Sequence, residues 1–277
     1  MKQTFTFILI SLISISLFSQ VDTTTNKTSK IWKNLKYDAK VGLKSVGYSL
    51  ARPIHWKRDN FLTAGGIIAG TGLLYLSDRE AQNYFVKQGK DAPDIIKDFG
   101  WYFGSPQNFF MVSAGVYGFG LLTDNEKVRR TGILIISSAT TTGIFQSISK
   151  TVVGRARPDT GDRDDFEPFS SKPGFHSFPS GHSILSFSMA HAIAKQFDSL
   201  WVKAGIYTVG SIAPISRLWA NAHWLSDVGL SMALSIVVVD SIDNFMNKNN
   251  YYEYSKPNTI SWRFSAGLGT IGLVGTF

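Results

Sequence analysis

Six apolar segments, each rich in Gly, Ser and Ala, limit the architectures that are open to this chain. They span residues 61–76, 109–122, 132–148, 184–194, 204–220 and 225–242. Small residues allow helices to pack closely against one another. Helix-breaking residues gather between the segments, for example in the loops 90–94 and 104–108. The pattern predicts one all-α domain over residues 61–247, built as a six-helix bundle without internal repeats.

The composition places this bundle between soluble and membrane proteins. Hydrophobic residues make up 44% of the 277-residue chain and charged residues 17%, below the quarter that is typical of soluble domains. The mean hydropathy is nevertheless close to zero, which is low for a bundle fully embedded in lipid. Most of the segments are too short, or too often interrupted by polar residues, for a span of roughly 20 residues. A membrane-embedded bundle and a soluble one both remain open.

The residues on either side of the predicted domain differ from it in character. Residues 1–20 begin with Lys2, continue with an apolar run and then turn polar, which resembles a signal peptide; an uncleaved anchor is the alternative. Residues 21–60 place lysines three and four positions apart between apolar residues, which predicts a basic amphipathic helix, at a membrane surface or with a solvated face. Residues 248–277 form a tail of no evident role, and the alternation within 260–277 predicts one or two strands.

The charge and the absence of cysteine narrow the choice of partners. A net charge of +8 favours anionic partners: phospholipid surfaces, phosphorylated substrates or nucleic acid. The cations gather at the ends of apolar segments without a basic stripe carrying exposed aromatic residues, so nucleic-acid binding is not indicated. Without cysteine there is neither a disulfide nor a thiolate metal site.

The first polar cluster, KTVVGRARP, closes the third apolar segment. Lys150, Arg155 and Arg157 bring three cations together, while Gly154 and Pro158 are expected to end the helix. On its own this cluster is explained equally well by cations that offset the negative end of a helix dipole.

The second cluster, FHSFPSGHS, precedes the fourth apolar segment. Pro179 bends the chain, Ser180 is a favourable N-cap residue, and Gly181 lets backbone amides approach a ligand closely. Free N–H groups at a helix N-terminus bind anions. His182 could donate a proton to such an anion because its ordinary pKa is close to neutral. The alternative is a capped helix with a packed or solvated histidine.

The third cluster, SRLWANAHWLSD, joins the last two apolar segments. His223 and Asp227 are four residues apart, so the carboxylate could orient one imidazole nitrogen and leave the other free to attack. Arg217 could bind a phosphate through its planar guanidinium group. Taken alone, a helical His/Asp pair beside tryptophans is commonly structural.

Together the three clusters supply what phosphoryl transfer requires. Its transition state spreads negative charge over three oxygens, so catalysis consists mainly of positioning and electrostatic stabilisation, which Lys and Arg can provide without a metal. The order is Lys, six residues, Arg-Pro; then Pro-Ser-Gly-His; then Ser-Arg, five residues, His, three residues, Asp. Residues 150–227 therefore resemble the type 2 phosphatidic acid phosphatase (PAP2) superfamily, which includes lipid phosphatases, class A acid phosphatases and vanadium haloperoxidases.

The resemblance implies a metal-independent phosphatase that forms a phosphohistidine. His223 would be the nucleophile, Asp227 would orient it, and His182 would protonate the leaving group. The residues expected to bind the phosphoryl oxygens are Lys150, Arg157, Ser180, Gly181 and Arg217. The apolar helices around the site favour a lipid monoester or diphosphate, such as phosphatidate, phosphatidylglycerophosphate, an isoprenyl diphosphate or a lipid A phosphate. No cofactor is implied.

Two other functions are compatible with the same residues. A vanadium-dependent haloperoxidase would use the same phosphate site for vanadate, although that subgroup generally has much longer chains; in a phosphatase, vanadate would act as an inhibitor. Bromide oxidation measured beside phosphate release would separate the two activities. A non-catalytic binder of phospholipids is disfavoured because every catalytic position is present.

The expected location is a bacterial-type cell envelope, at the membrane, with the site facing the periplasm or exterior. If all six segments span the membrane and the site faces outward, residues 21–60 and a loop containing Lys127, Arg129 and Arg130 both lie inside. The many cations in these two stretches agree with the positive-inside rule. A cleaved signal peptide would instead place residues 21–60 outside. The signal peptide, the six spans and the outward-facing site cannot all hold, and a soluble periplasmic form also remains open.

The remaining polar residues carry weaker indications. His176 could face the same pocket or be solvated, His191 is expected to be a satisfied core residue, and His55 has no evident role. The acidic loop 159–167 lacks the ligand spacing of a cation site. It is expected to be a solvated loop or a flap over the substrate.

Overall fold

The computed structural model describes residues 24–253, 261–267 and 270–276, and it confirms the predicted all-α class. The helices are α2 (Thr24–Ala51), α3 (Arg58–Leu76), α4 (Asp78–Asp91), α5 (Asp94–Phe103), α6 (Pro106–Leu122), α7 (Glu126–Val153), α8 (Gly181–Ala194), α9 (Leu200–Trp219) and α10 (Leu225–Lys248), with short 3-10 turns at Arg52–His55 and Pro173–Phe175. The chain divides into two units, Met1–Tyr37 and Asp38–Phe277. In the first unit, the described residues form the beginning of α2.

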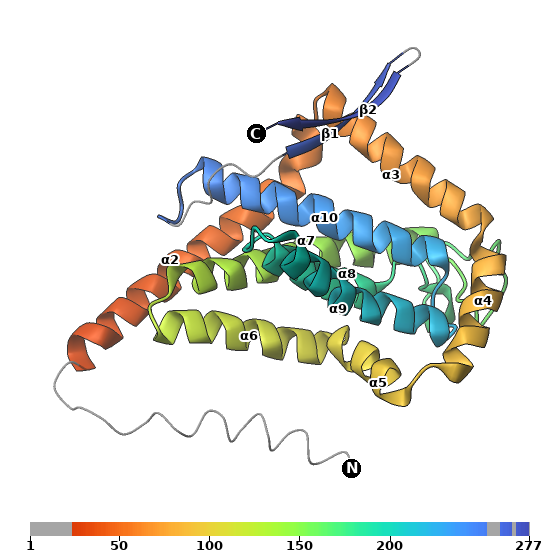
Figure 1. Cartoon of the computed structure of the whole chain (residues 1–277), viewed down its shortest axis with the longest axis horizontal. Coiled ribbons are helices and arrows are strands. Elements are labelled where there is room, and N and C mark those ends of the chain that lie inside the picture. Colours follow the sequence, from red (N-terminus) through yellow and green to blue (C-terminus); the bar gives the residue numbers. More distant parts are fainter. Residues whose placement is uncertain (1–23, 254–260, 268–269, 277) are drawn as a thin grey trace. The chain divides into compact units, whose positions relative to one another are not determined.

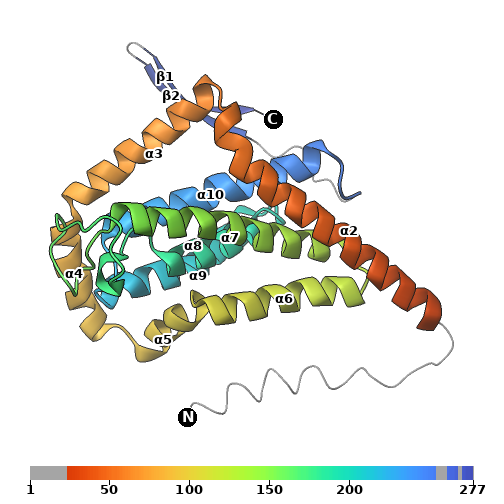
Figure 2. The same ribbon diagram turned by 180° about the vertical axis from the view of Figure 1, so that it is seen from behind.

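Helix α8 occupies the centre of the second unit. It packs against α7, α9 and α10, and Figures 1 and 2 show it among these helices from both sides. Its sequence is apolar nearly all round, as expected for a helix that is buried on most of its faces. The hydrophobic core around it includes Leu134, Ile135, Met189, Val239 and Ile242. The six predicted segments correspond to α3 and α6 to α10, so the helices that carry the polar clusters form the middle of the bundle.

Helices α4 and α5 lie in a region where the sequence suggested mainly loops. α4 follows α3 after a bend of 65°. Both helices approach α9 through glycines, since a Cβ at Gly89 would lie 2.9 Å from Trp219 Cβ, and one at Gly100 would lie 2.6 Å from Ser216 Cβ. These contacts place α4 and α5 beside the C-terminal end of α9, next to the third polar cluster.

The N-terminal part of α7 corrects one expectation. Residues 123–130 were expected to form a loop, but α7 begins at Glu126, and the Asn125 side chain accepts a hydrogen bond from the backbone of Val128 at 3.1 Å. Arg129 and Arg130 are buried in this helix. Arg129 pairs with Asp38 at 3.0 Å and Arg130 with Asp243 at 2.7 Å. Because these charges are bound inside the protein, they are not the exposed loop cations that the topology argument assumed.

The C-terminal end of α7 depends on a single glycine. Gly154 has a left-handed backbone (φ 57°), and a Cβ there would lie 1.9 Å from the carbonyl oxygen of Glu167. Other residues disfavour this conformation, and a side chain would not fit. The predicted helix end at Gly154 is thus confirmed, and the chain turns there into the extended segment that carries Arg155 and Arg157.

The C-terminal tail contains an antiparallel hairpin. β1 (Ser261–Gly267) pairs with β2 (Thr270–Thr276) in a register that runs from Ser261 opposite Thr276 to Gly267 opposite Thr270. These strands correspond to the β-like tail predicted over residues 260–277. The predicted signal peptide or anchor over residues 1–20 lies outside the described residues.

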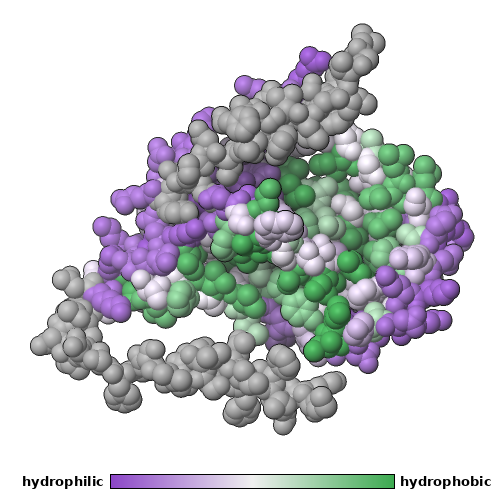
Figure 3. Space-filling view, viewed as in Figure 1, coloured by the Kyte–Doolittle hydropathy of each residue, from purple (hydrophilic) through white to green (hydrophobic). Residues whose placement is uncertain are grey.

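Apolar side chains are exposed over much of the second unit. On α3, Phe61, Leu62, Ile68 and Leu73 are 59–71% exposed. Figure 3 shows hydrophobic residues across the middle of one face, with hydrophilic residues towards its margins. Among the described helices, α10 is long and apolar enough to cross a membrane, although 44% of its apolar window is buried; α3 and α4 qualify as a second span only if the bent pair is taken as one. Extensive exposed apolar surface marks contact with a membrane or a partner.

Candidate active site

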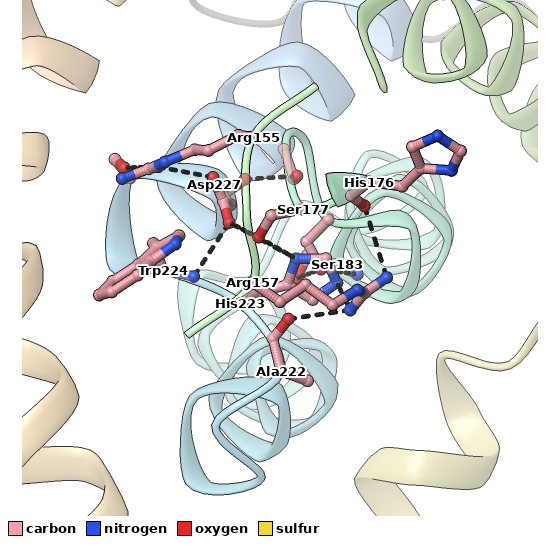
Figure 4. A network of polar contacts seen from close by, with 12 residues as sticks. Arg155, Arg157, His176, Ser177, Ser183, Ala222, His223, Trp224 and Asp227 are labelled. Carbon is pink, nitrogen blue, oxygen red and sulfur yellow. Dashed lines mark hydrogen bonds and ion pairs between the residues drawn. The ribbon is translucent and has the colours of Figure 1, made fainter. Parts of the chain in front are cut away.

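Hydrogen bonds join the three polar clusters at one place in the bundle. Arg157 of the first cluster donates to the carbonyl oxygen of Ala222 in the third at 2.9 Å. Lys150 of the first cluster donates to the carbonyl oxygen of His176 in the second at 2.7 Å. The end of α7, the start of α8 and the connection between α9 and α10 therefore form one site (Figure 4).

His223 and Asp227 are both buried and face one another. Nδ1 of His223 lies 3.6 Å from Oδ2 of Asp227. The Ser177 hydroxyl lies between them, donating to Oδ2 at 2.5 Å and standing 3.5 Å from Nδ1. The backbone N–H of Trp224 also donates to Oδ2, at 2.9 Å (Figure 4). The other ring nitrogen, Nε2, lies 3.3 Å from the Arg157 guanidinium.

The second oxygen of Asp227 is held by Arg155. This arginine is 2% exposed and donates to Oδ1 of Asp227 at 2.8 Å, to Ser226 at 2.8 Å and to Asp78 at 2.7 Å. Asp78 is fully buried and accepts two further hydrogen bonds, from the backbone and the side chain of Ser226. Arg155 is thus bound to two carboxylates and supports Asp227, whereas the sequence had grouped it with the cations of the first cluster.

The other three cations have no such partner. Among the described residues, no carboxylate forms an ion pair with Lys150, Arg157 or Arg217. Burial and the nearby charge of Arg157 lower the pKa of Lys150 to about 8 and that of Arg217 to about 10. Burying like charges together is unfavourable, so the site is complementary to an anion.

Both histidines of the site are uncharged at neutral pH. Burial lowers the pKa of His223 to about 4, although Asp227 acts in the opposite direction. Burial and then the charge of Arg217 lower the pKa of His182 to about 3, with Lys150 and Arg157 contributing. A neutral His223 has a free electron pair for attack. The Nε2 atom of His182 is buried and has no hydrogen-bond partner among the described residues.

Part of the chain is similar to a known protein family. Residues 131–251 match the model of the PAP2 superfamily. This matching part of the chain is called the PAP2 region below. The PAP2 region contains all eight predicted site residues, from Lys150 to Asp227.

Curated relatives of the PAP2 region are named lipid A 1-phosphatases. One from Porphyromonas gingivalis is 29% identical over 133 residues, which cover 46% of this chain and 26% of the relative. One from Rhizobium etli is 32% identical over 110 residues, which cover 37% of this chain and 44% of the relative. The chain therefore matches less than half the length of these relatives.

Two solved structures are also similar to the chain. LpxE of Aquifex aeolicus has a TM-score of 0.44 and 20% identity, with 58% of this chain and 92% of that chain covered. A transmembrane PAP2-type phosphatidylglycerolphosphate phosphatase of Bacillus subtilis has a TM-score of 0.48 and 19% identity, with 66% and 95% covered.

Ser180 and Gly181 begin α8 of the PAP2 region. Ser180 is the N-cap, as predicted, and its hydroxyl oxygen accepts hydrogen bonds from the backbone N–H and the hydroxyl of Ser183, at 3.5 and 2.9 Å. A Cβ on Gly181 would lie 2.3 Å from the side-chain nitrogen of Gln146, one turn before Lys150. This atom is at the end of a flexible side chain, so Gln146 could move aside for a small side chain at this position.

A further contact of the site, besides those of Asp78, comes from outside the PAP2 region. Trp101 of α5 lies with its ring centroid 4.2 Å from the Arg217 guanidinium carbon and 5.5 Å from the His182 ring. Arg217 otherwise donates to the hydroxyl of Ser216. The motifs gave no signal for Trp101, nor for Asp78, because both lie on helices that the sequence did not predict.

The rings of two further histidines bind groups other than the cations of the site. The ring of His176 contacts the carbonyl oxygen of Ser170 at 2.7 Å, so it offers its backbone oxygen, and not its ring, to Lys150. His191 lies in the bundle interior, where it contacts Tyr207 and Asp240, as expected of a satisfied core residue.

The acidic loop 159–167 is anchored to the end of α3. The Arg163 side chain donates to the carbonyl oxygens of Tyr75 and Leu76, at 3.3 and 3.1 Å, and Asp164 accepts a hydrogen bond from the Tyr75 hydroxyl. In the part of the chain that the structure describes, no group of three or more His, Cys, Asp or Glu side chains is placed to hold a metal ion.

Proposed function

We propose that the protein is a metal-independent phosphatase that hydrolyses a phosphate monoester or diphosphate of a lipid. One observation carries this proposal: Lys150, Arg157 and Arg217 lie near two neutral histidines, and none of these three cations forms an ion pair with a carboxylate of the described residues. A bound phosphoryl group would offset this positive charge. Because the curated relatives are named lipid A 1-phosphatases, a phosphorylated glycolipid is the first substrate to test.

In the first step, Nε2 of His223 attacks phosphorus. Asp227 and Ser177 keep the proton on Nδ1, so the electron pair of Nε2 points toward Arg157 and the bound phosphate. The phosphorus–nitrogen bond forms while the bond to the leaving oxygen breaks, and His182 gives this oxygen a proton. The cations stabilise the charge on the three remaining oxygens.

In the second step, water releases the phosphate. Neutral His182 takes a proton from a water molecule that attacks phosphorus, and the bond to Nε2 breaks. His223 is thereby restored as a neutral imidazole. His182 must be protonated before the first step, although its pKa in the empty site is about 3. The negative charge of the bound phosphate raises this pKa, so substrate binding favours the protonated form of His182 that acts as the general acid.

We further propose that the enzyme is associated with the membrane of a cell envelope and that its site opens to the exterior. The exposed apolar surface of α3 and α6 supports membrane contact.

The absence of cysteine allows the orientation of the site to be tested by single-cysteine labelling. Lys172→Cys, on the exposed loop before α8, should react with an impermeant maleimide in intact cells or spheroplasts. Protection until lysis would contradict the outward orientation.

Phosphate release from a substrate panel tests the activity. The panel contains lipid A, phosphatidate, phosphatidylglycerophosphate, an isoprenyl diphosphate and a soluble ester. His223→Ala should abolish turnover, whereas Lys150→Ala should raise KM and lower kcat. Radiolabelled phosphate should remain on the wild-type protein as an acid-labile adduct and be absent from His223→Ala. Wild-type rates in His223→Ala would refute the assignment, and activity on the soluble ester alone would refute a lipid substrate.

A further inference from the structure

A polar pocket lies beside the catalytic residues without including them. It has a volume of about 560 Å³, within the range of small-molecule sites. It lies between one face of α4 and the second residue after α9, and the polar residues lining it are Gln82, Asn83, Lys87, Lys90, Asp91 and Asn221.

Hydrogen bonds connect the wall of this pocket to two catalytic loops. The Gln82 side chain donates to Asn221 at 2.9 Å and to the carbonyl oxygen of Pro158 at 3.4 Å. Pro158 directly follows Arg157, and Asn221 lies two residues before His223. Consecutive Cα atoms are about 3.8 Å apart. The wall of the pocket therefore lies beside the loops that carry Arg157 and His223.

The side chains of the pocket favour a ligand that carries anionic and hydroxyl groups. Lys87 and Lys90 are exposed, one turn apart on α4, and neither forms an ion pair with a carboxylate of the described residues. Such ammonium groups bind phosphate or carboxylate as point charges. The amides of Asn83 and Asn221 can donate to and accept from hydroxyl groups, and Asp91 can accept from them.

We propose that this pocket binds the part of the lipid headgroup that is not hydrolysed, and that this part is a polyhydroxylated group with a second anionic substituent, such as a phosphorylated sugar. The inference rests on the proposed function, since it places the scissile phosphate at His223. The lysines recognise the second anion and the amides recognise the hydroxyl groups. The pocket thus distinguishes a phosphorylated glycolipid from phosphatidate, which has neither.

The test is a pair of charge-matched double variants. Lys87→Gln/Lys90→Gln removes the two charges of the pocket. Lys40→Gln/Lys248→Gln removes two exposed charges, the latter at the opposite end of α10 from Asp227. Three substrates are compared: lipid A with phosphates at both ends of its disaccharide, lipid A with the scissile phosphate alone, and phosphatidate. The pocket variant should raise KM about tenfold for the first substrate. It should leave kcat and both other KM values within twofold of wild type, and the control should change none.

A binding measurement separates this inference from the proposed activity. Calorimetry follows the binding of lipid A that retains only its non-scissile phosphate, in detergent micelles, to the wild type and to both double variants. Weaker binding to the pocket variant alone supports the subsite even if no substrate is hydrolysed. Equal binding to all three proteins, or an equal rise in KM for phosphatidate and bisphosphorylated lipid A, overturns it. A wild type that releases no phosphate from any substrate refutes the proposed function instead.

Discussion

Arg155 and Arg157 lie two residues apart, and replacing each with methionine should have opposite consequences. Arg155 is buried and joins Asp78 to Asp227, at 2.7 and 2.8 Å. Arg157 donates to backbone carbonyl oxygens, including that of Ala222, and its charged neighbours are other cations of the site. We expect Arg155→Met to lower the free energy of unfolding strongly. Arg157→Met should fold normally but lose activity.

The magnitudes follow from what each arginine leaves behind. Breaking a buried ion pair costs about 3–5 kcal/mol, because the remaining charge is unpaired. Arg155→Met leaves two buried carboxylates, Asp78 and Asp227, so we expect a loss of about 5 kcal/mol in the free energy of unfolding. For a chain of this size that corresponds to a fall in Tm of roughly 10–20 °C. Arg157→Met removes hydrogen bonds to backbone carbonyl oxygens but also repulsion from Lys150 and Arg217, and the two changes offset one another, so the free energy of unfolding should stay within about 1 kcal/mol of wild type. Its kcat should fall about 100-fold or more, as for other donors to a transition-state oxyanion.

Thermal unfolding and phosphate release, measured on the same detergent preparations, check both expectations. The double variant Asp78→Asn/Arg155→Met serves as a control, since only Asp227 is then left without its cation. It should recover part of the stability that Arg155→Met loses. If both single variants lower Tm equally, or if Arg155→Met is as stable as wild type, the division between a supporting and a substrate-binding arginine is wrong.

Four further predictions concern the same site. The unfolded pKa of histidine is about 6.5, while that of His182 in the fold is about 3 and that of His223 about 4. The unfolded chain therefore binds more protons below pH 6.5, and the free energy of unfolding should fall as pH decreases from 6.5 to 4. Denaturant unfolding should show a smaller fall for His182→Gln, and an unchanged fall would contradict the low pKa. Phosphate or vanadate should raise Tm in the wild type and in His223→Ala but not in Lys150→Met. Calorimetry in two buffers of different ionisation enthalpy should detect proton uptake on binding, which His182→Gln should abolish. Trp101→Leu should lower kcat/KM about 2- to 30-fold through loss of the cation–π contact with Arg217, and Trp101→Phe should restore most of it; equal losses in both variants would contradict this contact.

The sequence predicts the helices of the bundle better than those at its edge. α3 and α6 to α10 follow from long apolar runs whose patterns are local. α4 and α5 do not, because their positions depend on contacts with α9 that are distant in sequence, such as Gly100 against Ser216. The prediction of a loop around Arg129 and Arg130, where α7 begins, was wrong for a similar reason. Arg129 and Arg130 look like solvated loop cations until Asp38 and Asp243, far away in the chain, are placed beside them.

The residues of the site also differ in whether a local sequence pattern predicts them or distant contacts define their role. The spacing motif named the cations and both histidines because the chemistry requires these residue types in this order. The motif selected Arg157 as the phosphate-binding arginine, but it did not show the role of Arg155, because that role depends on Asp78 of α4. Ser177 was likewise hidden, because a serine in a loop carries no signal until its hydroxyl is found between His223 and Asp227.

The backbone after α7 explains why two arginines serve one histidine. Arg155 pairs with Phe166 in an isolated antiparallel bridge, and Arg157 precedes a proline, so the segment is extended. Residues two apart on an extended chain point to the same side and lie about 6.6 Å apart. The two guanidinium groups thus reach opposite ends of the Asp227–His223 pair, Arg155 at Oδ1 and Arg157 at Nε2. Because Arg155 occupies Oδ1, Oδ2 is left for the imidazole, and the electron pair on Nε2 is directed to where Arg157 would hold the phosphate. The extended backbone from Arg155 to Arg157 therefore aligns the Asp227 carboxylate, the His223 imidazole and the anion site.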